Sequence, residues 1–102
     1  MEGHSISPDV ISRYAGDAAR EVAGVADLAD APMHRGRAVE VAESDGATTV
    51  VVHVELEWGA NAQLVAAQVQ SRVVEYLERM ANATVSSVDV VVDRVSSPPE
   101  VP

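Results

Sequence analysis

One stretch of the chain carries three side chains that suit acid–base or metal chemistry. His53, Glu55 and Glu57 alternate with apolar residues in the segment 48–57, so they project from one side of a predicted β-strand. Alternate residues on one strand face lie about 7 Å apart, which allows adjacent pairs to share a metal ion. No pattern places another histidine beside them, because the other two lie in irregular stretches. We therefore expect a solvated acidic face, with no metal and no cofactor.

The remaining candidates for catalysis do not form a recognisable site. No serine lies in a Gly-x-Ser-x-Gly turn with a histidine and an acid placed to activate it. The chain also has no cysteine, no P-loop and no glycine pattern for dinucleotides. We expect a protein that is not an enzyme and has no catalytic residues.

The charge balance narrows the range of partners. The chain of 102 residues has 16 acidic residues against 7 basic ones, all arginine, which gives a formal charge of −9. Such a chain repels nucleic acid and anionic lipid headgroups. No apolar run approaches the roughly 20 residues that span a bilayer, and the N-terminus lacks the features of a signal peptide. We expect a cytoplasmic protein that binds no nucleic acid and does not insert directly into membranes.

Periodicity predicts the elements that position these residues. Ser7-Pro8-Asp9 is a typical helix start, and apolar residues at i+4 spacing predict a helix that ends near Val22. The irregular segment 26–36 indicates a loop. Strands are predicted over 39–43 and 48–57, joined by a turn that contains Asp-Gly.

The second half of the chain predicts a long helix and one more strand. The helix runs from 61 or 62 to 81, and the strand runs from 85 or 88 to 95. The fold class is therefore α+β: a single small domain of order α-β-β-α-β, with a three-stranded sheet and both helices packed on one face. The last strand is parallel to 48–57 through a right-handed crossover, and it lies beside either the first or the second strand. We expect a flexible N-terminus over 1–5, the domain over 6–95 and a disordered, proline-rich tail over 96–102.

The sheet face opposite the helices is the predicted contact surface. Val51 and Val91 break the apolar–polar alternation and lie on that face, while His53 and Glu55 contribute to a polar rim. Trp58 either covers the end of the sheet or anchors a partner. These five residues are the candidate protein-interaction residues.

Three stretches, in this order and spacing, resemble the alkaline shock protein 23 family of bacterial envelope stress response proteins. The resemblance runs from Ile6 to Val95 and rests on Ile6-Ser7-Pro8-Asp9-Val10-Ile11, on Val54-Glu55-Leu56-Glu57-Trp58-Gly59-Ala60-Asn61 and on Val88-Asp89-Val90-Val91-Val92. Trp58 stands where members usually carry tyrosine, and Asp89 where asparagine is common.

The resemblance implies an abundant, non-enzymatic cytoplasmic protein that associates with the membrane through a membrane-anchored partner. It further implies self-association into a homo-oligomer, and a scaffold or adaptor role in envelope homeostasis under stress. Some relatives suggest the alternative of a regulatory partner of a fatty-acid synthesis enzyme, such as a biotin-dependent carboxylase. The family supplies no catalytic residues to transfer.

Overall fold

In the computed structural model, which describes residues 7–29 and 37–98, helix α1 spans Pro8–Arg20. Ser7 caps its start, because the Ser7 side chain accepts a hydrogen bond from the Val10 amide at 3.3 Å. The helix ends two residues before the position that its apolar spacing predicts, and Glu21 is the C-cap. Its buried face consists largely of alanine, so α1 can approach the sheet closely.

A fourth strand, β1 (Val25–Leu28), corrects the prediction of a three-stranded sheet. It lies partly inside the segment 26–36, which the sequence pattern assigns to a loop. Val25 pairs with Leu56 and Leu28 pairs with Val54, both in antiparallel register. β1 has only four residues and no alternation of buried and exposed positions, so it lacks the period-two pattern that identifies strands.

Strands β2 (Val39–Ser44) and β3 (Ala47–Leu56) form the predicted hairpin. Asp45 and Gly46, which form the turn, have φ values of 53° and 79°. Positive φ at both central residues is what a tight hairpin turn requires, and the Asp-Gly pair tolerates it. β2 pairs with the first half of β3 and β1 with the second half, so β1 and β2 succeed one another along the same edge of β3.

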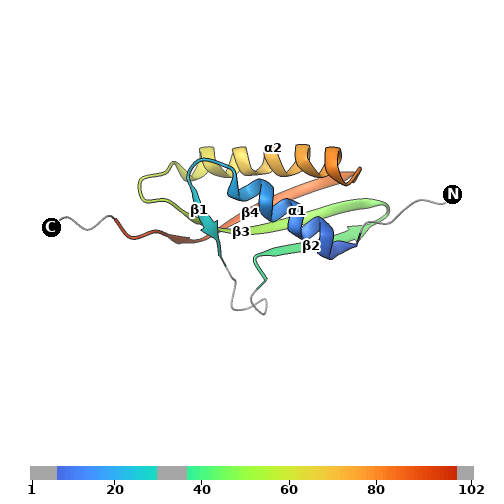
Figure 1. Cartoon of the computed structure of the whole chain (residues 1–102), viewed down its shortest axis with the longest axis horizontal. Coiled ribbons are helices and arrows are strands. Elements are labelled where there is room, and N and C mark those ends of the chain that lie inside the picture. Colours follow the sequence, from blue (N-terminus) through green and yellow to red (C-terminus); the bar gives the residue numbers. More distant parts are fainter. Residues whose placement is uncertain (1–6, 30–36, 99–102) are drawn as a thin grey trace.

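Helix α2 (Ala62–Met80) and strand β4 (Val85–Val95) complete the domain. β4 runs parallel to β3, as predicted. The sequence left open whether the last strand lies beside 39–43 or beside 48–57, and the structure shows that β4 pairs with β3. The sheet is therefore mixed, with β3 at its centre, and α1 and α2 cover one face of it (Figure 1).

The hydrophobic core fills the space between the helices and the sheet. Its largest fully buried side chains are Ile11 on α1, Val50, Val52 and Val54 on β3, and Val69, Val73 and Leu77 on α2. The predicted flexible segment 1–5 and residues 99–102 of the predicted disordered tail lie outside the described residues. Residues 96–98 follow β4 without regular structure.

Candidate functional site

Strand β3 divides its side chains between the two faces of the sheet, as the alternation predicts. Val50, Val52 and Val54 point toward the helices and are at most 1% exposed. Val51 and His53 therefore point to the opposite face, here called the outer face. His53, however, is only 5% exposed, so the prediction that it belongs to a solvated rim is wrong.

Two carboxylates, one on each neighbouring strand, cover His53. Its Nδ1 lies 2.8 Å from Asp93 Oδ2 on β4, and its Nε2 lies 2.8 Å from Glu40 Oε2 on β2. The carboxylate side chains are themselves about one-third exposed, at 31% for Asp93 and 34% for Glu40. The three side chains, which we call the His53 bridge, join three strands across the outer face.

Asp93 lies at a bulge of β4. The register of β4 against β3 shifts between the pairs Val54–Val92 and Glu55–Arg94, so Asp93 is an extra residue on β4. Asp93 follows Val91, the cross-strand partner of His53, by two residues. Alternation therefore places it on the outer face, where its carboxylate meets the imidazole. Glu40 is the cross-strand partner of Val51, two residues before His53 on the same face.

The electrostatics of the bridge favour a charged imidazole. Burial lowers the pKa of His53, but hydrogen bonds to Glu40 and Asp93, together with their negative charges, outweigh burial and raise that pKa above its ordinary value of 6.5. Only the protonated imidazole donates from both nitrogens at once. The geometry therefore fits an imidazolium held between two carboxylates.

The bridge is poorly suited to metal binding or acid–base catalysis. The two carboxylates lie against opposite nitrogens of one ring, so a single ion cannot reach both nitrogens and both acids. Among the residues that the structure describes, no group of three or more His, Cys, Asp or Glu side chains could hold a metal. The bridge instead offers an imidazole whose charge changes with pH, and hydrogen bonds that connect β2, β3 and β4.

The other predicted contact residues lie in two places. Val51 is half-buried and Val91 is 37% exposed, and Val91 is the cross-strand partner of His53. Glu55 is half-buried and accepts a hydrogen bond from Ser96 Oγ at 2.9 Å. These three residues share the outer face with His53. Trp58 lies apart, in the turn between β3 and α2; it is 61% exposed and so does not cover the end of the sheet.

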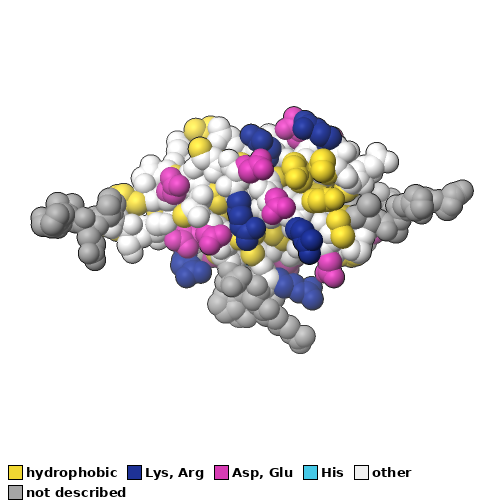
Figure 2. Space-filling model, viewed as in Figure 1, with side chains coloured by type: hydrophobic (Ala, Val, Ile, Leu, Met, Phe, Trp, Pro, Cys, Tyr) yellow, Lys and Arg dark blue, Asp and Glu magenta, His cyan; other side chains and the backbone are white. Residues whose placement is uncertain are grey.

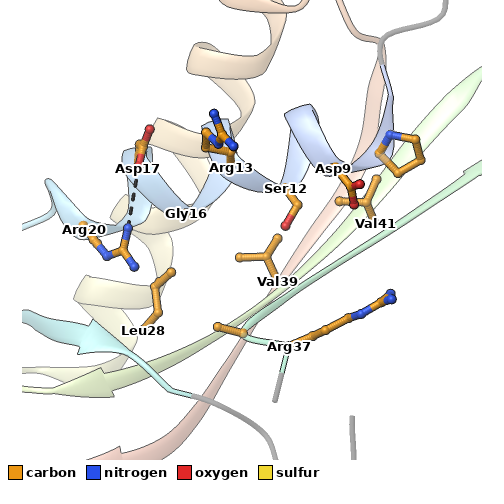
Figure 3. Close-up of a pocket in the computed structure, with 12 residues that line it drawn as sticks. Asp9, Ser12, Arg13, Gly16, Asp17, Arg20, Leu28, Arg37, Val39 and Val41 are labelled. Atoms are coloured by element: carbon orange, nitrogen blue, oxygen red, sulfur yellow. Dashed lines mark ion pairs between the residues drawn. The ribbon is translucent and has the colours of Figure 1, made fainter. Parts of the chain in front are cut away.

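Sequence reasoning missed a pocket between α1 and β2. It has a volume of about 330 Å³ and is lined by Arg13, Arg20, Arg37, Asp9 and Asp17, among others. The signal for it was the seven-residue spacing of two arginines on α1, which places them on one helix face. Figure 3 shows the arginines extending to different sides, with Arg20 paired to Asp17 at 3.6 Å. A ligand site needs polar groups that converge, and these do not.

Figure 2 shows arginine and acidic side chains interspersed on the helix face, with hydrophobic side chains gathered toward one end.

The helix face also carries an aromatic contact. Tyr14 on α1 and Tyr76 on α2 meet edge to face, with ring centroids 5.8 Å apart. Both rings pack against the core, so this pair joins the two helices.

Comparison with known proteins identifies both the family and the fold. The model of the alkaline shock protein 23 family, described as having a cell envelope-related function, matches residues 2–97. A search of curated proteins found no match. In addition, no helix among the described residues is long and apolar enough to cross a membrane.

Solved structures of MamM CTD share the fold. The copper form superposes with a TM-score of 0.66 at 12% identity, covering 91% of this chain and 91% of that chain. The manganese form of a MamM CTD variant gives a TM-score of 0.64 at 15% identity, covering 84% of this chain and 96% of that one. At these identities the likeness establishes the arrangement of helices and strands alone.

Proposed function

The chain belongs to the alkaline shock protein 23 family, whose function is related to the cell envelope, and from this premise we propose that it is a non-enzymatic, self-associating scaffold or adaptor. It works at the cytoplasmic side of the bacterial membrane and is held there by a membrane-anchored protein partner.

The observation that carries this proposal is the composition of the outer face. Val51 and Val91 provide partly exposed apolar area beside the His53 bridge. An apolar centre with a polar rim is the usual anatomy of a protein–protein interface. Because the bridge ties β2, β3 and β4 together, this face is a rigid platform for a partner.

The polar groups of this face also support a non-enzymatic role. Both nitrogens of His53 engage carboxylates, so the imidazole is occupied and not poised toward a substrate. Glu55 accepts from Ser96. A general base needs access to the proton that it removes, and the buried His53 does not offer it.

Charge bears on how the protein reaches the membrane. A formal charge of −9 opposes adsorption to a leaflet that is itself negative. A protein partner with a basic cytoplasmic segment removes this obstacle, because its charge is complementary to the acidic domain. The proposal therefore assigns the membrane contact to the partner.

The experiment compares membrane binding of the wild-type chain with that of the double variant Val51→Glu, Val91→Glu. The chain is sedimented with native bacterial membranes and with protein-free vesicles made from the extracted lipids. We expect the wild type to sediment with the membranes only, and the double variant to stay in the supernatant. Val10→Glu is the matched control, because Val10 and Val91 are each 37% exposed and Val10 lies on the helix face.

Either of two results would contradict the proposal. One is equal sedimentation with lipid vesicles and with native membranes, which excludes a protein anchor. The other is unchanged membrane binding by a double variant that keeps its circular dichroism spectrum. Co-purification of stoichiometric carboxylase subunits in place of a membrane protein would support the alternative of a fatty-acid synthesis regulator.

A further inference from the structure

Strand β4 has one edge that carries unpaired backbone groups. Leu56 on β3 accepts from the Ser96 amide, and Thr48 on β3 donates to Thr84, so the even-numbered residues of β3 bond toward β4. In a parallel pair, the residue opposite a bonded residue turns its own N–H and C=O the other way. Val90 lies opposite Val52, and its backbone groups therefore face away from β3.

On this edge, one outward-facing backbone group has a hydrogen-bond partner within the chain. The Val88 carbonyl, two residues before Val90, also faces away from β3. It accepts a hydrogen bond from the Gln70 side chain on α2 at 2.9 Å. Val92, opposite Val54, turns outward like Val90. Within the residues 7–29 and 37–98, no strand pairs with this edge of β4.

The surface beside the open edge is depleted of charge. The first half of α2, Ala62–Ser71, has no charged residue, whereas 23% of the whole chain is charged. Leu64 on this half-helix is 56% exposed. On β4 itself, Val91 and Val92 are 37% and 38% exposed. Loss of charge together with exposed apolar side chains marks the core of an interface rather than a solvated surface.

We propose that this edge pairs with the same edge of a second copy, antiparallel, about a two-fold axis at Val91. The inference deepens the self-association on which the proposed function rests. Val90 of each copy exchanges backbone hydrogen bonds with Val92 of the other, and the two Val91 side chains meet on the outer face. The sheets of the two copies become one continuous sheet.

Charges of both signs flank the paired segment. The two-fold axis places Asp89 of one copy opposite Asp93 of the other and one residue from Arg94. Asp93 is hydrogen-bonded to His53 in its own copy, and the adjacent Arg94 is opposite in sign to Asp89. No proline or lysine, the usual blocks on edge pairing, interrupts Val90–Val92.

A second copy suits this edge better than an unrelated peptide. Two-fold dimers are the commonest oligomers because one patch serves both sides, and this edge is a short uncharged patch with opposite charges flanking it. The formal charge of −9 on each copy opposes association at low ionic strength. Dimerisation therefore strengthens as salt is added, up to the concentration at which the charges are screened.

The absence of cysteine allows a direct test by disulfide cross-linking of Val91→Cys. Across the axis, this position is a non-hydrogen-bonded antiparallel pair with Cα atoms about 4.5 Å apart, which a disulfide can span. We expect oxidation to give a covalent dimer on the order of 100-fold faster than in Val10→Cys, because pairing holds the two thiols at an effective concentration in the mM range. Val10 has the same exposure as Val91, 37%. Equal rates for the two variants would overturn the proposal.

Val90→Pro provides the second measurement. Proline removes an amide that faces away from β3, so the β3–β4 bonds remain, and proline is tolerated at such edge positions. We expect light scattering to show twice the 10.7 kDa chain mass for the wild type and a single chain for the folded variant. A folded Val90→Pro that still dimerises would refute the edge pairing. If this variant unfolds, the comparison of Val91→Cys with Val10→Cys decides.

The outcomes separate this inference from the proposed function. If the wild type is an oligomer but Val91→Cys cross-links no faster than Val10→Cys, pairing through the β4 edge is ruled out. Self-association then takes place through another surface. A wild type that is monomeric at every concentration and salt level overturns both the edge pairing and the self-association. Membrane binding through a partner is measured separately by the wild-type arm of the sedimentation experiment, which compares native membranes with protein-free vesicles and does not alter Val91.

Discussion

Raising the pH above 6.5 should destabilise the fold through His53. The protonated imidazole donates from Nδ1 to Asp93 and from Nε2 to Glu40, each at 2.8 Å. Loss of one proton leaves one nitrogen as an acceptor facing a carboxylate. A hydrogen bond to a charged group contributes about 1.5–3 kcal/mol. Because both carboxylates are about one-third exposed, we expect the lower end, about 1.5 kcal/mol.

The sign of the effect follows from the direction of the pKa shift. The folded-state pKa of His53 is raised above the ordinary value of 6.5. The stabilisation is therefore fully present below pH 6.5, and it is lost as the pH rises through the folded-state pKa. For a domain of this size, about 1.5 kcal/mol corresponds to a fall in Tm of about 6–12 °C.

The assay is urea unfolding followed by circular dichroism at a series of pH values from about 5.5 to 9.5. His53→Gln is the control, since it keeps every other titrating group, including the two remaining histidines. We expect the free energy of unfolding to fall with pH in the wild type and to change little in His53→Gln. A wild type whose stability is constant over this range would refute the reasoning, as would an equal slope in the variant.

Three further predictions concern single side chains. Glu40→Gln should lower the pKa of His53, as measured by NMR titration of the imidazole, whereas Glu43→Gln on the same strand should leave it unchanged; equal pKa values in both variants would contradict the bridge. Gly46→Ala should destabilise the fold by about 1 kcal/mol, because Gly46 has a positive φ. Gly24→Ala should cost more, because Gly24 also has a positive φ and its new Cβ would lie 2.6 Å from Val65 Cγ2. Equal losses of stability in urea unfolding would exclude the clash. Leu77→Ala should cost about 2–5 kcal/mol and Met80→Ala far less, because Leu77 is fully buried and Met80 is 49% exposed; similar costs would place the core elsewhere.

Periodicity in the sequence was sufficient to predict two helices and three of the four strands. The i+4 spacing on α1, the Asp-Gly turn and the valine alternation on β3 are strong local signals, and each element lies within a few residues of its prediction. β1 was missed because it has four residues and owes its existence to pairing with Val54–Leu56. A short strand held by tertiary contacts carries no pattern of its own.

The outer face was predicted in part, for a comparable reason. Alternation assigns His53 to that face, but it does not show how far the neighbouring strands reach over it. Burial of His53 depends on Glu40 from β2 and on Asp93 from β4, which lies at a bulge. A bulge is a property of strand register, which the linear sequence does not display. Alternation predicts that Asp93 faces outward, but it does not predict that the Asp93 carboxylate reaches the imidazole.

The position of β3 between local and distant partners has a consequence for the order of folding. The β2–β3 hairpin closes through a two-residue turn, whereas β4 can join β3 only after α2 has packed across the sheet. Contacts between residues distant in sequence form late, because a long loop must close first. The His53–Asp93 bond, 40 residues apart in sequence, therefore belongs to the last stage. Removing this bond should accelerate unfolding and leave the folding rate nearly unchanged.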